Sequence, residues 1–69
     1  DNVIFSDFSE NIVVVKTIPG AASTVGAALD ASDWTEIIGT VAGDDSIFVL
    51  VKPREAAETI VERIRALIH

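Results

Sequence analysis

Hydrophobic residues in this chain form short β-branched runs and helically spaced stripes, separated by turn residues. The run IVVV at residues 12–15 is typical of a strand, whereas the apolar positions between Ala21 and Leu29 recur with the spacing of one helix face. We predict strands at about residues 2–8, Ile12–Thr17, Ile37–Ala42 and Ser46–Val51, and helices from Ala21 to about Ala31 and from Pro53 onwards. The order of elements is therefore ββαββα.

The second helix carries the clearer amphipathic pattern, with its acidic residues near the start and its basic residues near the end, as the helix dipole favours. Its apolar stripe consists of Ala56, Ala57, Ile60, Val61, Ile64, Leu67 and Ile68. We predict one α+β domain over residues 1–69, a two-layer ββαββα fold with a four-stranded antiparallel sheet and two helices on one face.

The first helix consists largely of small residues, with Gly26 inside it. A glycine within a helix costs about 1 kcal/mol relative to alanine. Small side chains permit close approach of the backbone, either to the sheet or to a neighbouring subunit.

Two helices cover only one face of a four-stranded sheet, and a sheet covered on one side should alternate apolar and polar residues. Residues 12–15 and 47–51 are apolar at every position instead. We predict that the uncovered face is apolar and is buried against other copies of the chain, since a large apolar patch is unusual on a soluble monomer. The alternative is that these are central strands with scattered surface valines.

Composition limits how such a small domain is stabilised. The chain has 69 residues, 11 acidic and 5 basic, and a formal net charge of −6. Domains near this size often depend on disulfides, metals or partner subunits. Cysteine is absent and the single histidine is His69, which excludes thiolate sites and multi-histidine metal sites within one chain. Association with other subunits is the remaining source of stability.

Several classes of function are disfavoured. A chain of charge −6 with scattered Lys and Arg is poorly suited to bind duplex nucleic acid directly. There is no signal-peptide pattern, and no apolar stretch approaches the ~20 residues that cross a bilayer. No cysteine nucleophile exists, no histidine lies near a serine or a carboxylate pair, and GTVAGDD precedes a strand rather than the helix of a phosphate loop. We expect neither an enzyme nor a metal site.

The carboxylates Asp44 and Asp45 are adjacent in the turn between the third and fourth strands. A solvated hairpin turn is one explanation, because Asp and Gly favour turns for backbone reasons. Asp30 stands near the negative end of the first helix, which costs a few tenths to about 1 kcal/mol. The other explanation is that Asp30, Asp44 and Asp45, from the same or neighbouring chains, converge on a cation. A guanidinium fits because its planar donors match carboxylates in paired hydrogen bonds.

The chain resembles the C-terminal domain of bacterial arginine repressors over essentially its whole length. The matching segments are Val13-Val14-Val15-Lys16-Thr17, Pro19-Gly20-Ala21-Ala22, Ala28-Leu29-Asp30 and IGTVAGDDSI at residues 38–47. The combination of the PGAA segment with the AGDD segment at this separation is specific, whereas either alone would be weak.

This resemblance implies a cytoplasmic domain that forms homotrimers, which pair into homohexamers, with the corepressor L-arginine bound between trimers. It implies that Asp44 and Asp45 hold the arginine side chain, that Asp30 lies near its amino group, and that backbone at Ala42 and Gly43 lines the site. It also implies that operator DNA is bound through an N-terminal winged helix-turn-helix domain absent from this chain. The repressed genes would be those of arginine biosynthesis and catabolism.

One position departs from the family pattern: Ser23 stands where many members have Gln or His, so its shorter hydroxyl has less reach toward the ligand. Two other functions stay open from the residues alone, an oligomerisation module without a ligand and a sensor of another amino acid. Trp34 either covers a neighbouring chain or caps its own core.

Overall fold

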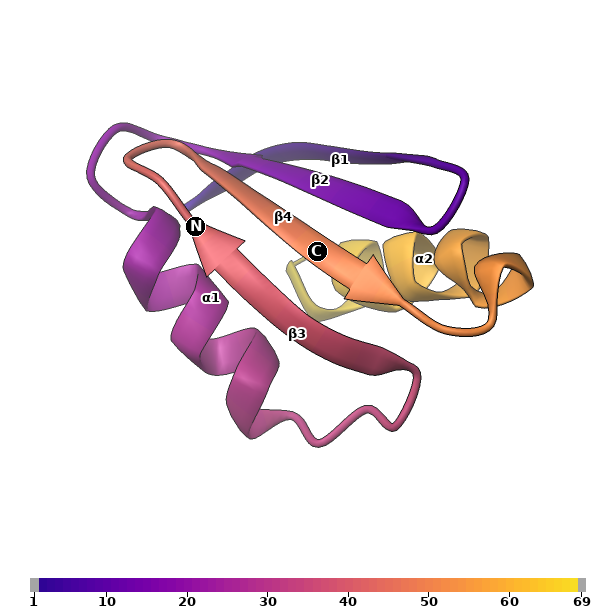
Figure 1. The fold of residues 1–69 in the computed structure, drawn as a ribbon. Coiled ribbons are helices and arrows are strands. Elements are labelled where there is room, and N and C mark those ends of the chain that lie inside the picture. Colours follow the sequence, from indigo (N-terminus) through magenta and orange to yellow (C-terminus); the bar gives the residue numbers. More distant parts are fainter. Residues whose placement is uncertain (1, 69) are drawn as a thin grey trace.

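The computed structural model describes residues 2–68 of the chain, with side chains described as far as residue 66. Its elements are β1 (Val3–Ser9), β2 (Ile12–Thr17), α1 (Ala22–Ala31), β3 (Ile37–Ala42), β4 (Ser46–Val51), a 3₁₀ turn (Arg54–Ala56) and α2 (Ala57–Ile68). The predicted order ββαββα and the α+β class are confirmed, with both helices on one side of a four-stranded sheet (Figure 1).

The start of the second helix differs from the prediction. Pro53 has extended backbone and is followed by the 3₁₀ turn, in which the N–H of Ala56 donates to the carbonyl of Pro53 at 2.9 Å. The α-helix therefore begins only at Ala57. The predicted apolar positions Leu67 and Ile68, and the histidine His69, lie outside the residues whose side chains are described.

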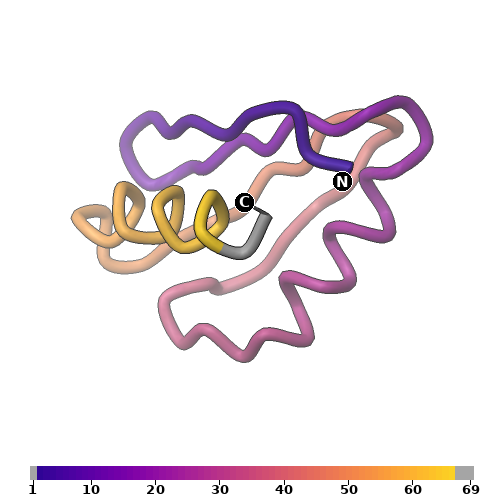
Figure 2. Tube along the Cα trace, turned by 180° about the vertical axis from the view of Figure 1, so that it is seen from behind, coloured from indigo at the N-terminus to yellow at the C-terminus, as the bar shows by residue number. Residues whose placement is uncertain are grey.

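The strands lie in the order β1-β2-β4-β3, and every neighbouring pair is antiparallel. The chain thus forms two hairpins, joined in the middle of the sheet by β2 and β4, with Val15 opposite Ile47. Seen from behind, α2 runs along the β1–β2 hairpin and α1 along β3 (Figure 2). Each helix packs mainly against the edge strand of one hairpin, α2 against β1 and α1 against β3, and both also contact the central strands.

The hydrophobic core fills the space between the sheet and the helices. It contains Val13, Val15, Ile47, Val49 and Val51 from the central strands, and Ala22, Leu29, Ala57, Ile60, Val61 and Ile64 from the helices. Trp34 is half-buried against this core, with the guanidinium of Arg63 5.7 Å from the centre of its ring. Within a single chain, Trp34 therefore caps its own core.

The other face of the sheet is uncovered and apolar, as predicted. β2 and β4 alternate buried positions with more exposed ones, although nine of their twelve residues are apolar. We call this the outer face; its apolar members include Phe5, Ile12, Val14, Val41, Phe48 and Leu50. Phe48 is 57% exposed and Val41 is 74% exposed in the single chain. Burial of this face by other copies stays a prediction.

The small residues of α1 allow the helix to approach its own sheet. A methyl group placed on Gly26 would lie 3.6 Å from the side chain of Ala42 on β3. The sequence left open whether this helix approaches its own sheet or a neighbouring subunit, and the structure shows contact with the sheet. This close approach sets α1 directly beside the strand that leads into the acidic turn.

Candidate functional site

The acidic turn, residues 43–45, joins β3 to β4 and is tied to the rest of the chain through its main chain. The N–H of Gly43 donates to the carbonyl of Ser46 at 2.8 Å, which closes the hairpin. The carbonyl of Asp44 accepts the N–H groups of Gly20 at 3.1 Å and Ala22 at 3.3 Å. The turn therefore lies against the first residues of α1, where Ser23 follows directly.

The connection between β2 and α1 bends sharply to make this contact. Gly20 has φ of +84°, a conformation that residues with a side chain rarely adopt. The carbonyl of Asp45 accepts the N–H of Thr17 at 2.8 Å, so the turn is also anchored to the end of β2. The proline-glycine pair of the PGAA segment thus brings a helix start and an acidic turn together.

Asp45 has a cationic partner from its own chain. Lys16 Nζ lies 3.3 Å from Asp45 Oδ2 and donates to Ser46 Oγ at 2.8 Å, while Ser46 Oγ donates to Asp45 Oδ1 at 3.1 Å. The three side chains form a closed ring of hydrogen bonds, which we call the Lys16 ring. The Asp45 side chain is 50% exposed and that of Lys16 is 34% exposed. One carboxylate of the acidic turn is therefore already engaged on both oxygens.

Lys16 could not be identified as a site residue from the sequence. Its only local signal is that it is the single charged residue in the second predicted strand. The contact arises because β2 and β4 are neighbours, which pairs Lys16 with Ser46. Asp44 differs, since its carboxylate makes no hydrogen bond or ion pair within residues 2–68, and it remains open to a cation.

The Lys16 ring also changes the titration of Asp45. The hydrogen bond from Ser46, followed by the hydrogen bond and charge of Lys16, holds the pKa of Asp45 below its ordinary value. A carboxyl whose pKa is lower in the folded chain stabilises folding above its ordinary pKa. That contribution is lost as the pH falls through the lowered value.

We expect carbon-13 NMR of the side-chain carboxyls to show Asp45 titrating below the ordinary value of about 3.9. Ser46→Ala removes the largest cause, so it should raise the pKa of Asp45 toward that value. A variant that titrates like the unchanged protein would contradict the ring.

Asp30 lies at the other end of α1. Thr40 Oγ1, on β3, donates to Asp30 Oδ1 at 3.0 Å. Ala42 is two residues further along the same strand and leads into the turn. Along α1, Asp30 is eight residues from Ala22, or about 12 Å at 1.5 Å per residue. A ligand that contacts both Asp30 and the acidic turn of one chain therefore needs two separate polar groups.

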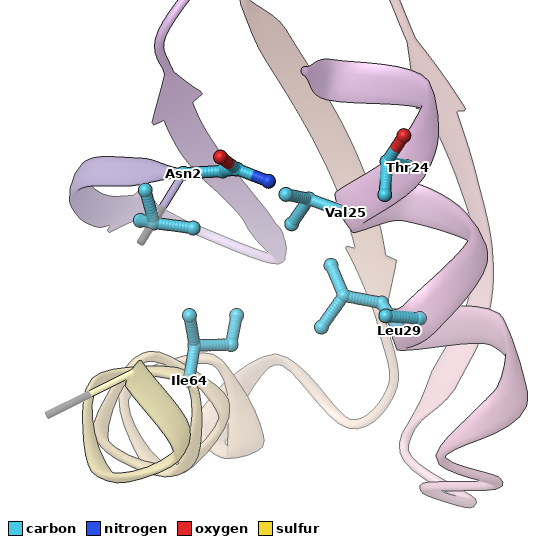
Figure 3. A pocket seen from close by; sticks show the side chains of 7 residues that line it. Asn2, Thr24, Val25, Leu29 and Ile64 are labelled. Atoms are coloured by element: carbon cyan, nitrogen blue, oxygen red, sulfur yellow. The ribbon is translucent and has the colours of Figure 1, made fainter.

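Two hollows lie near α1. The first, of about 250 Å³, opens between α1, α2 and the start of β1, with Val25, Leu29 and Ile64 on its walls (Figure 3). None of its described lining residues is charged, so it does not suit a guanidinium. The second, of about 300 Å³, is lined by Asp30, Trp34 and their neighbours. Neither is lined by Asp44 or Asp45. In the single chain Asp44 is exposed and the Asp45 side chain is half-exposed.

Two other features bear on the chemistry. No group of three or more His, Cys, Asp or Glu side chains that could hold a metal ion occurs in the described part of the chain. Among the helices of residues 2–68, none has the length and apolar character to cross a membrane.

Comparison with known proteins gives a consistent result. The family described as "Arginine repressor, C-terminal domain" matches residues 1–66. The arginine repressor of Moorella thermoacetica is 52% identical over 67 residues, which is 97% of this chain and 44% of that protein. Those of Syntrophomonas wolfei and Caldicellulosiruptor saccharolyticus are 51% and 50% identical, over 97% and 99% of this chain and 44% and 45% of theirs. The chain thus spans less than half the length of these relatives.

Proposed function

Because the chain belongs to the family of arginine repressor C-terminal domains, we propose that it senses L-arginine and assembles the subunits of a transcriptional repressor. The family is one of repressors and not of enzymes, in agreement with the sequence-based exclusion of catalysis. In this proposal the repressor acts in the cytoplasm on genes of arginine biosynthesis and catabolism. Operator DNA is bound by a separate winged helix-turn-helix domain of the longer protein.

The acidic turn is the observation that carries the proposal. It presents the carboxylate of Asp44, which has no partner among the side chains that the structure describes, beside the hydrogen-bonded carboxylate of Asp45. Two adjacent carboxylates repel each other, and a guanidinium both neutralises them and fills their acceptors in pairs. In the proposed site Asp44 and Asp45 hold the side chain of L-arginine.

The other predicted residues complete the site. Asp30 binds the amino group of the ligand, while main chain at Ala42 and Gly43 lines the pocket. Ser23, in the first turn of α1, contributes at most a short hydroxyl. The turn faces open surface in one chain, and this supports a ligand enclosed between two copies rather than within one.

The outer face supports the assembly half of the proposal. Its exposed aromatic and aliphatic side chains suit contact with other copies, which would form a trimer on apolar contacts alone. Six chains at a formal charge of −6 each carry −36 together, so two trimers that meet through acidic turns repel. Each bound L-arginine adds one positive charge there. A ligand that binds only the paired trimers stabilises the hexamer by mass action.

Titration calorimetry with L-arginine, citrulline, lysine and ornithine tests the proposal. We expect binding of arginine and none of citrulline, because citrulline keeps the shape of arginine and lacks its charge. A ligand-free oligomerisation module would give no heat with any of the four. Stronger binding of another amino acid would instead identify a different sensor.

A further inference from the structure

The Lys16 ring uses only part of the hydrogen-bonding capacity of Asp45. A carboxylate has about four acceptor positions, two on each oxygen. Ser46 occupies one position on Oδ1 and Lys16 one on Oδ2. Lys16 Nζ and Ser46 Oγ are 2.8 Å apart, so they occupy the side of the carboxylate where the two oxygens point in parallel. The free position on each oxygen points outward, and each member of this pair can accept one N–H group of a guanidinium.

The ring also fixes the direction in which Asp45 presents that pair. An unsupported aspartate on an exposed turn rotates freely about its side-chain bonds, whereas this one is bonded to two partners from two strands. Lys16 itself is bonded to both other members of the ring. Removal of either partner would free the carboxylate to turn.

Lys16 stands on the outer face, where it is paired with Phe5 of β1 and Ser46 of β4. When other copies cover this face, the ammonium group loses water. A buried charge without partners is costly, whereas one that keeps its carboxylate is tolerated. Covering the outer face therefore strengthens the hold of Lys16 on Asp45 and does not release it.

We propose that Lys16 is a positioning residue for the arginine site, one that orients Asp45 toward the guanidinium and links the outer face to the acidic turn. This inference rests on the proposed function, because it assigns a role at the same site. Lys16 does not touch the ligand in this arrangement. It acts through Asp45, with Ser46 as the second support.

The test is the arginine affinity of Lys16→Met, measured by calorimetry, with the mass of the assembly measured by sedimentation. We expect the affinity to fall about tenfold, the factor that corresponds to about one charge-assisted hydrogen bond. Assembly without arginine should persist, because methionine adds apolar surface to the outer face. Lys16→Arg keeps the charge and the donors and should restore binding. Lys52→Met removes the same charge from an exposed site at the end of β4 and serves as the matched control.

Ser46→Ala gives a second reading, since it removes the other support of Asp45 without a change in charge. It should also weaken arginine binding. An affinity of Lys16→Met for arginine that equals or exceeds that of the unchanged protein would overturn the proposal. Lys16 would then either have no effect on the site or compete with arginine for Asp45. Absence of arginine binding by the unchanged protein would instead refute the proposed function itself.

Discussion

Replacement of Asp45 by asparagine is expected to abolish the response of assembly to arginine. An amide has no charge, and its nitrogen is a donor where the carboxylate has a second acceptor oxygen, so it loses both the attraction to a guanidinium and one acceptor. It also leaves Lys16 without its carboxylate partner. Losing one partner of an enclosed charge pair costs about 3 kcal/mol, or roughly a hundredfold in affinity. Sedimentation velocity with and without arginine measures the response directly.

The control for this variant is Glu62→Gln, which removes the same charge from the exposed side of α2. Its assembly should still respond to arginine, so that a loss in Asp45→Asn reflects the site and not the net charge. The trimers of Asp45→Asn should persist, because they depend on the outer face. An unchanged arginine response in Asp45→Asn would show that the ligand binds elsewhere.

We expect substitutions at two adjacent residues of β4 to have different effects, one on the folding of the single chain and the other on association between copies. Ile47 is 0% exposed and Phe48, on the opposite face, is 57% exposed. Ile47→Ala should lower the free energy of unfolding by about 2–5 kcal/mol, through lost burial and the cavity left behind. A typical domain has a free energy of unfolding of roughly 5–15 kcal/mol. The loss is a large share of this, so the variant should be largely unfolded when dilute.

Phe48→Ala serves as the matched comparison for Ile47→Ala. In the single chain its ring contributes little to the core, so the fold should be retained while association weakens. Urea unfolding followed by circular dichroism over a range of protein concentrations separates the two effects. Equal destabilisation of both variants at the lowest concentration would contradict the assignment of Phe48 to an interface between copies.

Local patterns were enough to predict the elements of this fold. The β-branched run at residues 12–15 and the apolar run at 47–51 became central strands, because branched side chains fit a pleated surface. The 3₁₀ turn before α2 was not predicted. A proline indicates that a helix starts nearby, but it does not show whether the first turn is 3₁₀ or α-helical.

The pairing of the two hairpins was not predictable from the sequence, and the candidate site depends on it. Both hairpins have a strongly apolar second strand, but nothing local indicates that those two strands adjoin at the centre of the sheet. The partnership of Lys16 with Asp45 follows from that pairing and was missed. Asp44 and Asp45 were found because adjacent carboxylates at a turn are costly without a cation. Asp30 was found because a carboxylate near the negative end of a helix is unfavourable, whereas the family resemblance assigned Ser23. Their roles toward arginine stay predictions.

The acidic turn differs from an ordinary hairpin tip in how its main chain is bonded. Its carbonyl groups at Asp44 and Asp45 accept N–H groups from Thr17, Gly20 and Ala22. A loop held in this way has little conformational entropy left to lose when a ligand arrives, so binding is not weakened by the ordering of a flexible segment. The tip is preorganised, and most of the favourable contact energy with an incoming amino acid is retained as affinity.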